Sequence, residues 1–192
     1  MANNNIPFRF GNRKLPKTTM IFNMTSAGDC PSKAMGLCKQ HKICYARKAE
    51  RLYPQVLPYR RRQAKYWDTH TAEKISTDIL NKLKRKKNNV DKFRYNEAGD
   101  FRTRADIEKL HHIAKTLKKH GIITYGYTAR TDLDFRGVSF VVLGSGFKAK
   151  NGQTTVINKN EDIPKHYIEC PGSCKQCSLC ATKKSNIAFR KH

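Results

Sequence analysis

The sequence has few acidic residues and no long apolar run. Its 192 residues include 15 Asp and Glu against 39 Lys and Arg, which gives a formal net charge of +24. A transmembrane helix is not expected, because no stretch reaches about 18 apolar residues. The polar start of the chain lacks the apolar segment of a signal peptide. We therefore expect a cytoplasmic protein.

The excess of positive charge predicts a polyanionic partner. A surface so charged repels itself, and phosphate contacts that release counterions would stabilise it. Nucleic acid is the expected partner, with DNA and RNA both open. An acidic protein is the alternative. A membrane is not expected, because the basic segments lack a strongly apolar opposite face.

Two segments concentrate this charge. The first, from Tyr59 to Trp67, interleaves arginines that can bind phosphates with aromatic rings that can stack on unpaired bases. The second is a basic run that extends from Lys82 to Arg94 and has Asp91 as its only acid. Core packing of the aromatics and a solvated helix end are the simpler interpretations. The candidate nucleic-acid-binding residues are Arg60, Arg61, Arg62, Lys65, Tyr66, Lys84, Arg85, Lys86 and Lys87.

Four of the seven cysteines lie close together near the C-terminus, at Cys170, Cys174, Cys177 and Cys180. Thiols stay reduced in the cytoplasm, so this spacing predicts metal ligands rather than disulfides. Four thiolates can bind one zinc ion or the irons of a four-iron cluster. Successive gaps of two residues are typical of a short chain that wraps a cluster, so we favour iron–sulfur over zinc.

The other three cysteines, Cys30, Cys38 and Cys44, follow the first predicted strand. Three thiolates suit a second cluster in which one iron stays open to a ligand. The alternative is a closed structural zinc site that adds His41 to the three cysteines. The predicted cofactor is therefore one iron–sulfur cluster, or two, with zinc as the alternative.

The hydrophobic pattern predicts an α/β fold with a small, mostly parallel sheet of four to five strands, similar to a partial barrel, with flanking helices. We expect a basic arm at 1–17, an α/β domain at 18–165 and a Cys-rich C-terminal extension at 166–192. The predicted strands are 18–22, 93–96, 122–127, 138–143 and 154–157, the last at an edge. The predicted helices are 43–52, 58–67, 72–86 and 103–120.

Polar residues follow two of these strands. Glu97 and Asp100 follow the second strand, and Arg130 follows the third. Because ligands bind at the carboxyl ends of parallel strands, these three are the candidate catalytic residues. An ordinary polar turn is the competing interpretation for Glu97 and Asp100.

Segments 26–47, 94–101, 125–130 and 170–192 together resemble the gene product 88 family of phage proteins. That resemblance implies a phage origin and says little about activity. A more distant resemblance is to radical S-adenosylmethionine enzymes, through the cysteine loop and the acidic turn. In those enzymes the acidic turn holds the methionine amine, which implies that role for Glu97 and S-adenosylmethionine as a cofactor. The wider cysteine gaps depart from that family, as do the four or five strands where a partial barrel needs six.

The sequence therefore predicts a phage-encoded iron–sulfur or metal protein that binds or acts on nucleic acid, with radical chemistry at an open cluster as one form of that function. One alternative is a non-enzymatic nucleic-acid-binding protein with a structural zinc site. Another is a binder of an acidic host protein. The sequence does not decide whether the chain is an enzyme.

Overall fold

A computed structural model of the chain describes residues 7–85, 89–182 and 186–191. Within these ranges one eight-stranded sheet has the order β1-β2-β3-β4-β5-β6-β8-β7. Only β1 is antiparallel to its neighbour; every other pair is parallel. The predicted α/β fold with a mostly parallel sheet is confirmed. The strands are β1 (Arg9–Phe10), β2 (Thr19–Phe22), β3 (Lys92–Tyr95), β4 (Ile123–Thr128), β5 (Val141–Ser145), β6 (Gln153–Ile157), β7 (Tyr167–Glu169) and β8 (Asn186–Arg190).

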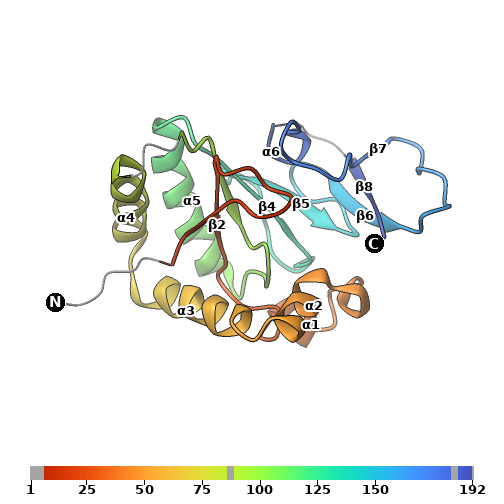
Figure 1. Cartoon of the computed structure of the whole chain (residues 1–192), viewed down its shortest axis with the longest axis horizontal. Helices are drawn as coiled ribbons and strands as arrows, with labels where there is room; N and C mark the ends of the chain where they lie inside the picture. The colour runs from red at the N-terminus through yellow and green to blue at the C-terminus, as the bar shows by residue number, and fades with distance from the viewer. Residues whose placement is uncertain (1–6, 86–88, 183–185, 192) are drawn as a thin grey trace.

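Helices lie on both faces of the sheet. The helices are α1 (Pro31–Ala34), the 3-10 helix η1 (His41–Ile43), α2 (Tyr45–Leu52), α3 (Val56–Thr69), α4 (Ala72–Arg85), α5 (Arg104–Lys119) and α6 (Leu179–Thr182). Figure 1 shows α4 and α5 on one side of the sheet and α6 near the other end of the molecule, against β4 and β5. None of the described helices is long and apolar enough to cross a membrane.

The sheet is larger than the predicted four to five strands. β1 and β7 have two and three residues, too few to show an alternating pattern. β8 lies in the tail, whose residues we assigned to metal binding. It pairs with β6, so β6 is not the edge strand that we predicted. Residues 166–192 therefore add two strands to the common sheet.

The main core lies between the sheet and helices α3, α4 and α5. Alternate strand residues such as Met20, Phe22 and Phe93 point to this side and pack in one cluster with the apolar stripe of α5. The intervening residues of β2, β3 and β4 point to the opposite face, where α6 and its flanking loop lie. Because both faces are covered, β2 is buried along its whole length.

Candidate functional site

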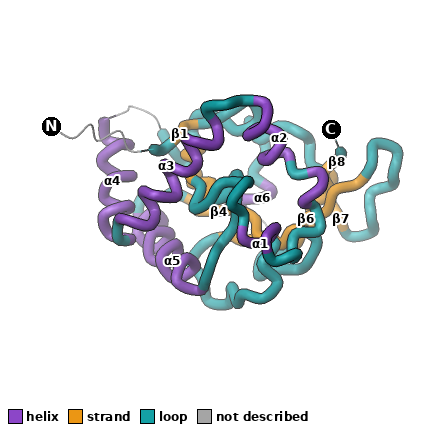
Figure 2. Tube along the Cα trace, turned by 90° about the horizontal axis from the view of Figure 1, so that it is seen from below, coloured by secondary structure: helices purple, strands orange, loops and turns teal. Residues whose placement is uncertain are grey.

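The cysteine loop begins where β2 ends, at the carboxyl ends of the parallel strands. Cys30 precedes α1 and Cys44 precedes α2, each as the N-cap residue. Figure 2 looks at the molecule from this side, with α1, α2 and α3 around it. Cys44 packs against a small buried cluster of Ala27, Ala46 and Ala98, and Ala98 belongs to the acidic turn that follows β3.

The three thiols of this loop affect one another's pKa. Burial raises the pKa of the Cys30 thiol to about 12, and the neighbouring Cys38 adds to the rise. Burial likewise raises the pKa of Cys38, with a contribution from Cys44. A metal that binds here must therefore displace protons from the thiols.

Buried polar side chains join the cysteine loop to the acidic turn. The side-chain oxygen of Asn23 accepts a 2.7 Å hydrogen bond from the backbone N–H of Ala98. Asn96 accepts one from the N–H of Met24, and Thr25 accepts one from the N–H of Asp100. These contacts fix the two segments relative to each other.

Asp100 lies at the centre of this junction. Its buried carboxylate accepts four hydrogen bonds, from the hydroxyls of Ser32 and Thr128 and from the N–H groups of Phe101 and Ala129. Burial raises the pKa of this carboxyl, while the four donors oppose the rise. With its oxygens occupied, Asp100 holds the loops together and does not face a ligand as we predicted.

Arg130 is also occupied within the protein. Its guanidinium donates to both carboxylate oxygens of Asp132 and to the backbone carbonyls of Phe101 and Arg102. The side chain is 4% exposed. Arg130 therefore ties the loop after β4 to the loop after β3, and a ligand-facing role does not fit it.

Glu97 is the predicted catalytic residue that keeps access to solvent. Its carboxylate accepts a hydrogen bond from the side-chain amide of Asn12 and lies 3.8 Å from Nη2 of Arg60. The side chain is 18% exposed. The hydroxyl of Tyr45, which directly follows Cys44, donates a 2.7 Å hydrogen bond to the Glu97 carbonyl. Glu97 therefore lies beside the cysteine loop with a partly exposed negative charge.

A buried ion pair supports the cysteine loop from behind. Nη1 of Arg60 lies 2.9 Å from Oε1 of Glu50, and both side chains are buried. The Glu50 carboxylate also accepts hydrogen bonds from the N–H groups of Ala27 and Gly28. The sequence prediction missed Glu50, although a lone acid in the otherwise basic α2 was a signal.

The other predicted nucleic-acid-binding residues differ in their surroundings. Because Arg60 is buried in this ion pair, it is not available to phosphates. Tyr66 is half-buried, donates to Asp78 and stacks on His70, so its ring is not a free platform. Exposed positions are occupied by Arg61, which pairs with Asp29, and by Arg62, Lys65 and Lys84. The side chain of Arg85 and residues Lys86 and Lys87 lie outside the described residues.

The four tail cysteines line one pocket against the sheet. The other residues of its wall include Thr19, Lys92, Tyr125 and Tyr127. The first half of the loop that carries the cysteines is held by backbone hydrogen bonds: Cys170 donates its N–H to the carbonyl of Ala188, and Cys174 donates to that of Lys14. Thr19 and Lys92 are the first residues of β2 and β3, whereas the cysteine loop follows the last residue of β2. The two cysteine groups therefore lie near opposite ends of these strands.

No group of three or more His, Cys, Asp or Glu side chains is arranged to hold a metal ion in the part of the chain that the structure describes. Four sulfurs around one zinc ion must lie within about 4 Å of one another. A four-iron cluster is wider, because each thiolate binds a different iron. The predicted metal centres stay predictions.

The comparisons with known proteins show the family. A family model described as gene product 88 matches residues 6–144. The chain belongs to the gene product 88 family. The match includes the cysteine loop and the acidic turn, and it ends before the tail cysteines. This confirms the resemblance to that phage family, and the likeness to radical S-adenosylmethionine enzymes finds no support in it. No curated protein and no solved structure matches the chain.

Proposed function

We propose that this phage-family protein binds an iron–sulfur cluster through Cys30, Cys38 and Cys44, with one iron left open to a ligand. One observation carries the proposal. β2, β3, β4, β5, β6 and β8 are parallel and lie side by side in chain order, and the three cysteines directly follow the first of them. Six strands are also the number that a partial barrel of the radical S-adenosylmethionine kind needs, and this supports the proposal.

The surroundings of the loop support three thiolate ligands better than four zinc ligands. His41, the fourth ligand of the zinc alternative, is exposed, and its Nδ1 lies 3.0 Å from the carbonyl oxygen of Cys38. The nearby Asp100 has no free oxygen. Glu97 is an acid with solvent access that adjoins the loop through Tyr45.

In this proposal S-adenosylmethionine is the ligand of the open iron. The cluster would supply an electron for cleavage of a carbon–sulfur bond in that sulfonium compound. The partly exposed carboxylate of Glu97 would accept its amino group, and Asn12 and Arg60 would hold that carboxylate in place. Asp100 and Ser32 would keep the cysteine loop in position.

Purification without oxygen tests the proposal. We expect iron and sulfide in the wild-type protein. Cys38→Ala should lose iron both in the wild-type background and in a Cys177→Ser background, which removes any contribution of the tail cysteines. In the reduced protein, added S-adenosylmethionine should change the electron paramagnetic resonance signal of the Cys38-dependent cluster. Zinc in place of iron, or iron content that is unchanged in Cys38→Ala, would contradict it.

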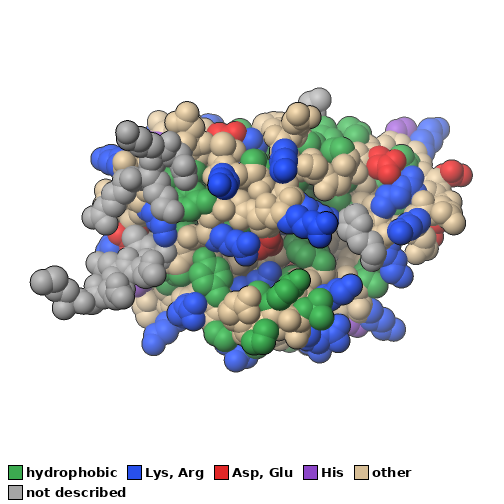
Figure 3. Space-filling model, in the orientation of Figure 1, with side chains coloured by type: hydrophobic (Ala, Val, Ile, Leu, Met, Phe, Trp, Pro, Cys, Tyr) green, Lys and Arg blue, Asp and Glu red, His purple; other side chains and the backbone are tan. Residues whose placement is uncertain are grey.

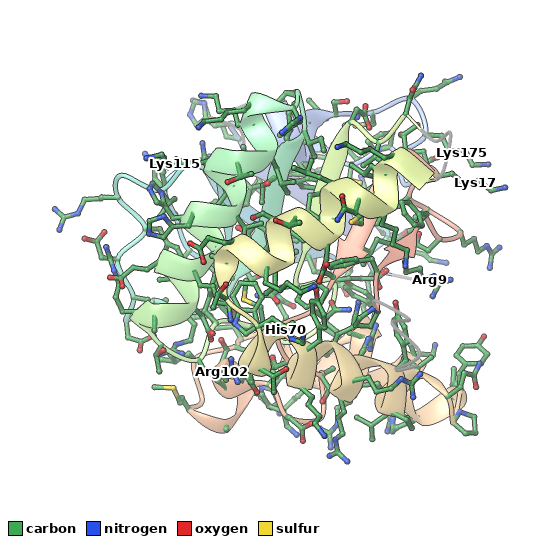
Figure 4. The ribbon with its side chains drawn as sticks, turned by 90° about the vertical axis from the view of Figure 1, so that its left-hand side faces the viewer. Arg9, Lys17, His70, Arg102, Lys115 and Lys175 are labelled. Atoms are coloured by element: carbon green, nitrogen blue, oxygen red, sulfur yellow. The ribbon has the colours of Figure 1, made fainter. Side chains whose placement is uncertain are left out.

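A second candidate function, binding of single-stranded nucleic acid, is supported by the exposed surface of α2 and α3. The positive charge alone does not identify a binding surface, because basic side chains lie on more than one side of the molecule. In Figure 4, Arg9, Lys17 and Lys175 lie on a different side from Arg102. Over the lower part of Figure 3, however, basic and apolar side chains lie together. The exposed residues of this α2–α3 surface are Tyr45, Arg47, Lys48, Arg51, Leu52, Tyr53, Arg61, Arg62 and Lys65.

This combination suits a strand with unpaired bases. Basic side chains can bind phosphates while the two exposed tyrosines stack on bases. Tyr45 also contacts the Glu97 turn, so a strand bound here would pass beside the cysteine loop. The surface therefore connects the predicted partner to the proposed cluster site.

Fluorescence anisotropy at several salt concentrations tests this binding. Contacts to about six phosphates should cost several powers of ten in affinity between low and moderate salt. Replacing Arg61 and Arg62 with Gln should weaken binding to all sequences and flatten the salt dependence, and Tyr53→Ala should affect single strands more than duplexes. Arg136→Gln, which removes an exposed arginine at another position, is the control. Absence of binding at low salt would instead favour an acidic protein partner.

A further inference from the structure

Arg94 is a buried cation without a carboxylate partner among the described residues. It lies in the middle of β3 and is 4% exposed. Its Nη1 has no hydrogen-bond partner. Two aromatic rings flank the guanidinium, whose carbon lies 3.9 Å from the centre of the Tyr127 ring and 5.4 Å from that of Tyr125. A buried charge without a counter-charge is costly, so this environment indicates a missing anion.

The same two tyrosines line the pocket of the tail cysteines. Burial raises the pKa of Tyr127, and the neighbouring Cys180 thiol adds to that rise. Burial raises the pKa of Cys180 to about 11, and both Tyr127 and the charge of Arg94 oppose that rise. Arg94 thus contacts two rings that form part of the wall around the tail thiols.

A second unsatisfied polar atom borders this pocket. The hydroxyl of Thr19 is buried, lacks a partner and belongs to a residue of the pocket wall. Within the described ranges, three buried side-chain polar atoms lack a partner, and those of Thr19 and Arg94 are two of them. Buried polar groups are nearly always satisfied. One unsatisfied atom in the pocket wall, and another on an arginine that contacts two tyrosines of that wall, therefore point to a bound group.

We propose that Arg94 is the buried counter-cation of a thiolate metal centre held by Cys170, Cys174, Cys177 and Cys180. Four thiolates around a zinc ion, or around a doubly charged four-iron core, leave a net charge of about −2. Binding releases the thiol protons and creates the anion that Arg94 lacks. The hydroxyls of Thr19 and Tyr127 then donate hydrogen bonds toward the sulfur atoms.

The charge argument is the same for zinc and for a cluster. All four thiols line one pocket, and no three of them are placed to bind a single ion within the described residues. Of the two centres we favour a cluster, in which each thiolate binds a different iron. The inference concerns the tail alone and does not depend on what Cys30, Cys38 and Cys44 bind.

Metal retention tests the role of Arg94. The protein is prepared without oxygen in the Cys38→Ala background, which removes the contribution of the N-terminal loop, and iron, sulfide and zinc are measured during competition with a chelator. Arg94→Gln should retain the metal about 10- to 100-fold less well, the usual effect of losing a residue that supports metal ligands. Arg94→Lys, which keeps the charge, should retain it better than Arg94→Gln.

The control is Arg136→Gln. It removes an exposed positive charge that is not part of this pocket, so retention should stay close to that of the parent protein. If the centre is a cluster, Arg94→Gln should also lower its reduction potential, because the more negative reduced form loses a nearby cation.

Two results would overturn the inference. Parent-like retention in a folded Arg94→Gln protein would remove the counter-cation role. Metal content that is unchanged in Cys177→Ser would remove the tail centre itself. If circular dichroism shows that Arg94→Gln does not fold, Tyr127→Phe is tested in its place. Metal retention in Tyr127→Phe should fall below that of the parent protein, by less than we expect for Arg94→Gln. Parent-like retention in Tyr127→Phe would again contradict the inference.

Discussion

The hydroxyl of Ser32 donates a 2.6 Å hydrogen bond to the carboxylate of Asp100, and both residues are buried. Ser32 lies between Cys30 and Cys38 in the chain, and Asp100 ends the acidic turn after β3. One buried contact therefore couples the cysteine loop to the turn that carries Glu97. Buried polar networks whose members are all satisfied hold a single geometry, which a ligand site requires.

Removal of this carboxylate should destabilise the protein strongly. Asp100→Ala leaves four donors without their acceptor and should cost about 3 kcal/mol or more of the free energy of unfolding. Ser32→Ala, which removes one donor, should cost about 1 kcal/mol. Urea unfolding measures both. Asp134→Ala is the control, because that exposed carboxylate pairs with Arg136 at the surface and should matter little. Equal stability of the two aspartate variants would show that the junction does not stabilise the fold.

Gly99 should tolerate no side chain. Its φ is +73°, and a Cβ atom there would lie 2.0 Å from Oγ1 of Thr25. Gly137 has the same φ but nothing within 4 Å of its Cβ position, so Gly137→Ala carries only the backbone strain, about 1 kcal/mol. Gly99→Ala should lower the melting temperature clearly more than Gly137→Ala. Similar melting temperatures would mean that Thr25 can move aside.

Stability should fall in acid partly through Asp106. Burial raises the pKa of its carboxyl, but hydrogen bonds from Arg102 and Trp67 outweigh this and hold the pKa below the usual 3.8. The pKa of Asp106 is lower in the folded than in the unfolded protein. Its carboxylate therefore makes its full contribution to the free energy of unfolding above the usual pKa, and this contribution is lost as pH falls through the folded-state pKa. Asp106→Asn should therefore lose stability at pH 7 and show a weaker pH dependence below about pH 4. Urea unfolding at several pH values measures this. If the free energy of unfolding changed with pH in the same way for the wild type and Asp106→Asn, the prediction would be wrong.

Loss of Arg60 should affect stability rather than phosphate binding. Arg60→Met leaves Glu50 buried and unpaired, which should cost about 3–5 kcal/mol. If Arg60→Met remains folded, its affinity for nucleic acid should fall with salt as steeply as that of the wild type. The variant in which Gln replaces Arg61 and Arg62 should show a flatter dependence on salt. A flatter salt dependence in Arg60→Met would show that Arg60 reaches phosphates after all. The double variant with Glu50→Gln should recover part of the lost stability, as a urea-based mutant cycle would measure.

Several elements could be predicted from local patterns. The apolar stripe from Ile107 to Leu117 predicted α5, and the apolar runs predicted β4 and β5 to within a few residues. β1, β7 and β8 could not be predicted, because two or three residues carry no periodicity and the cysteines of the tail suggested a separate extension.

The sequence by itself determined the α/β class, the parallel sheet, the family and the positions of the two cysteine groups, because periodicity and spacing are local properties of the chain. Only the tertiary structure decided which charged residues are buried. In the sequence, Arg60 and Arg94 belong to basic segments. In the structure both are buried against residues distant in sequence: Arg60 lies beside Glu97, and Arg94 lies against the ring of Tyr127. Likewise, Asp100 resembled a ligand-facing acid until folding brought Ser32 and Thr128 to its oxygens. Burial and hydrogen-bond partners depend on contacts between distant segments, and a local pattern does not contain them.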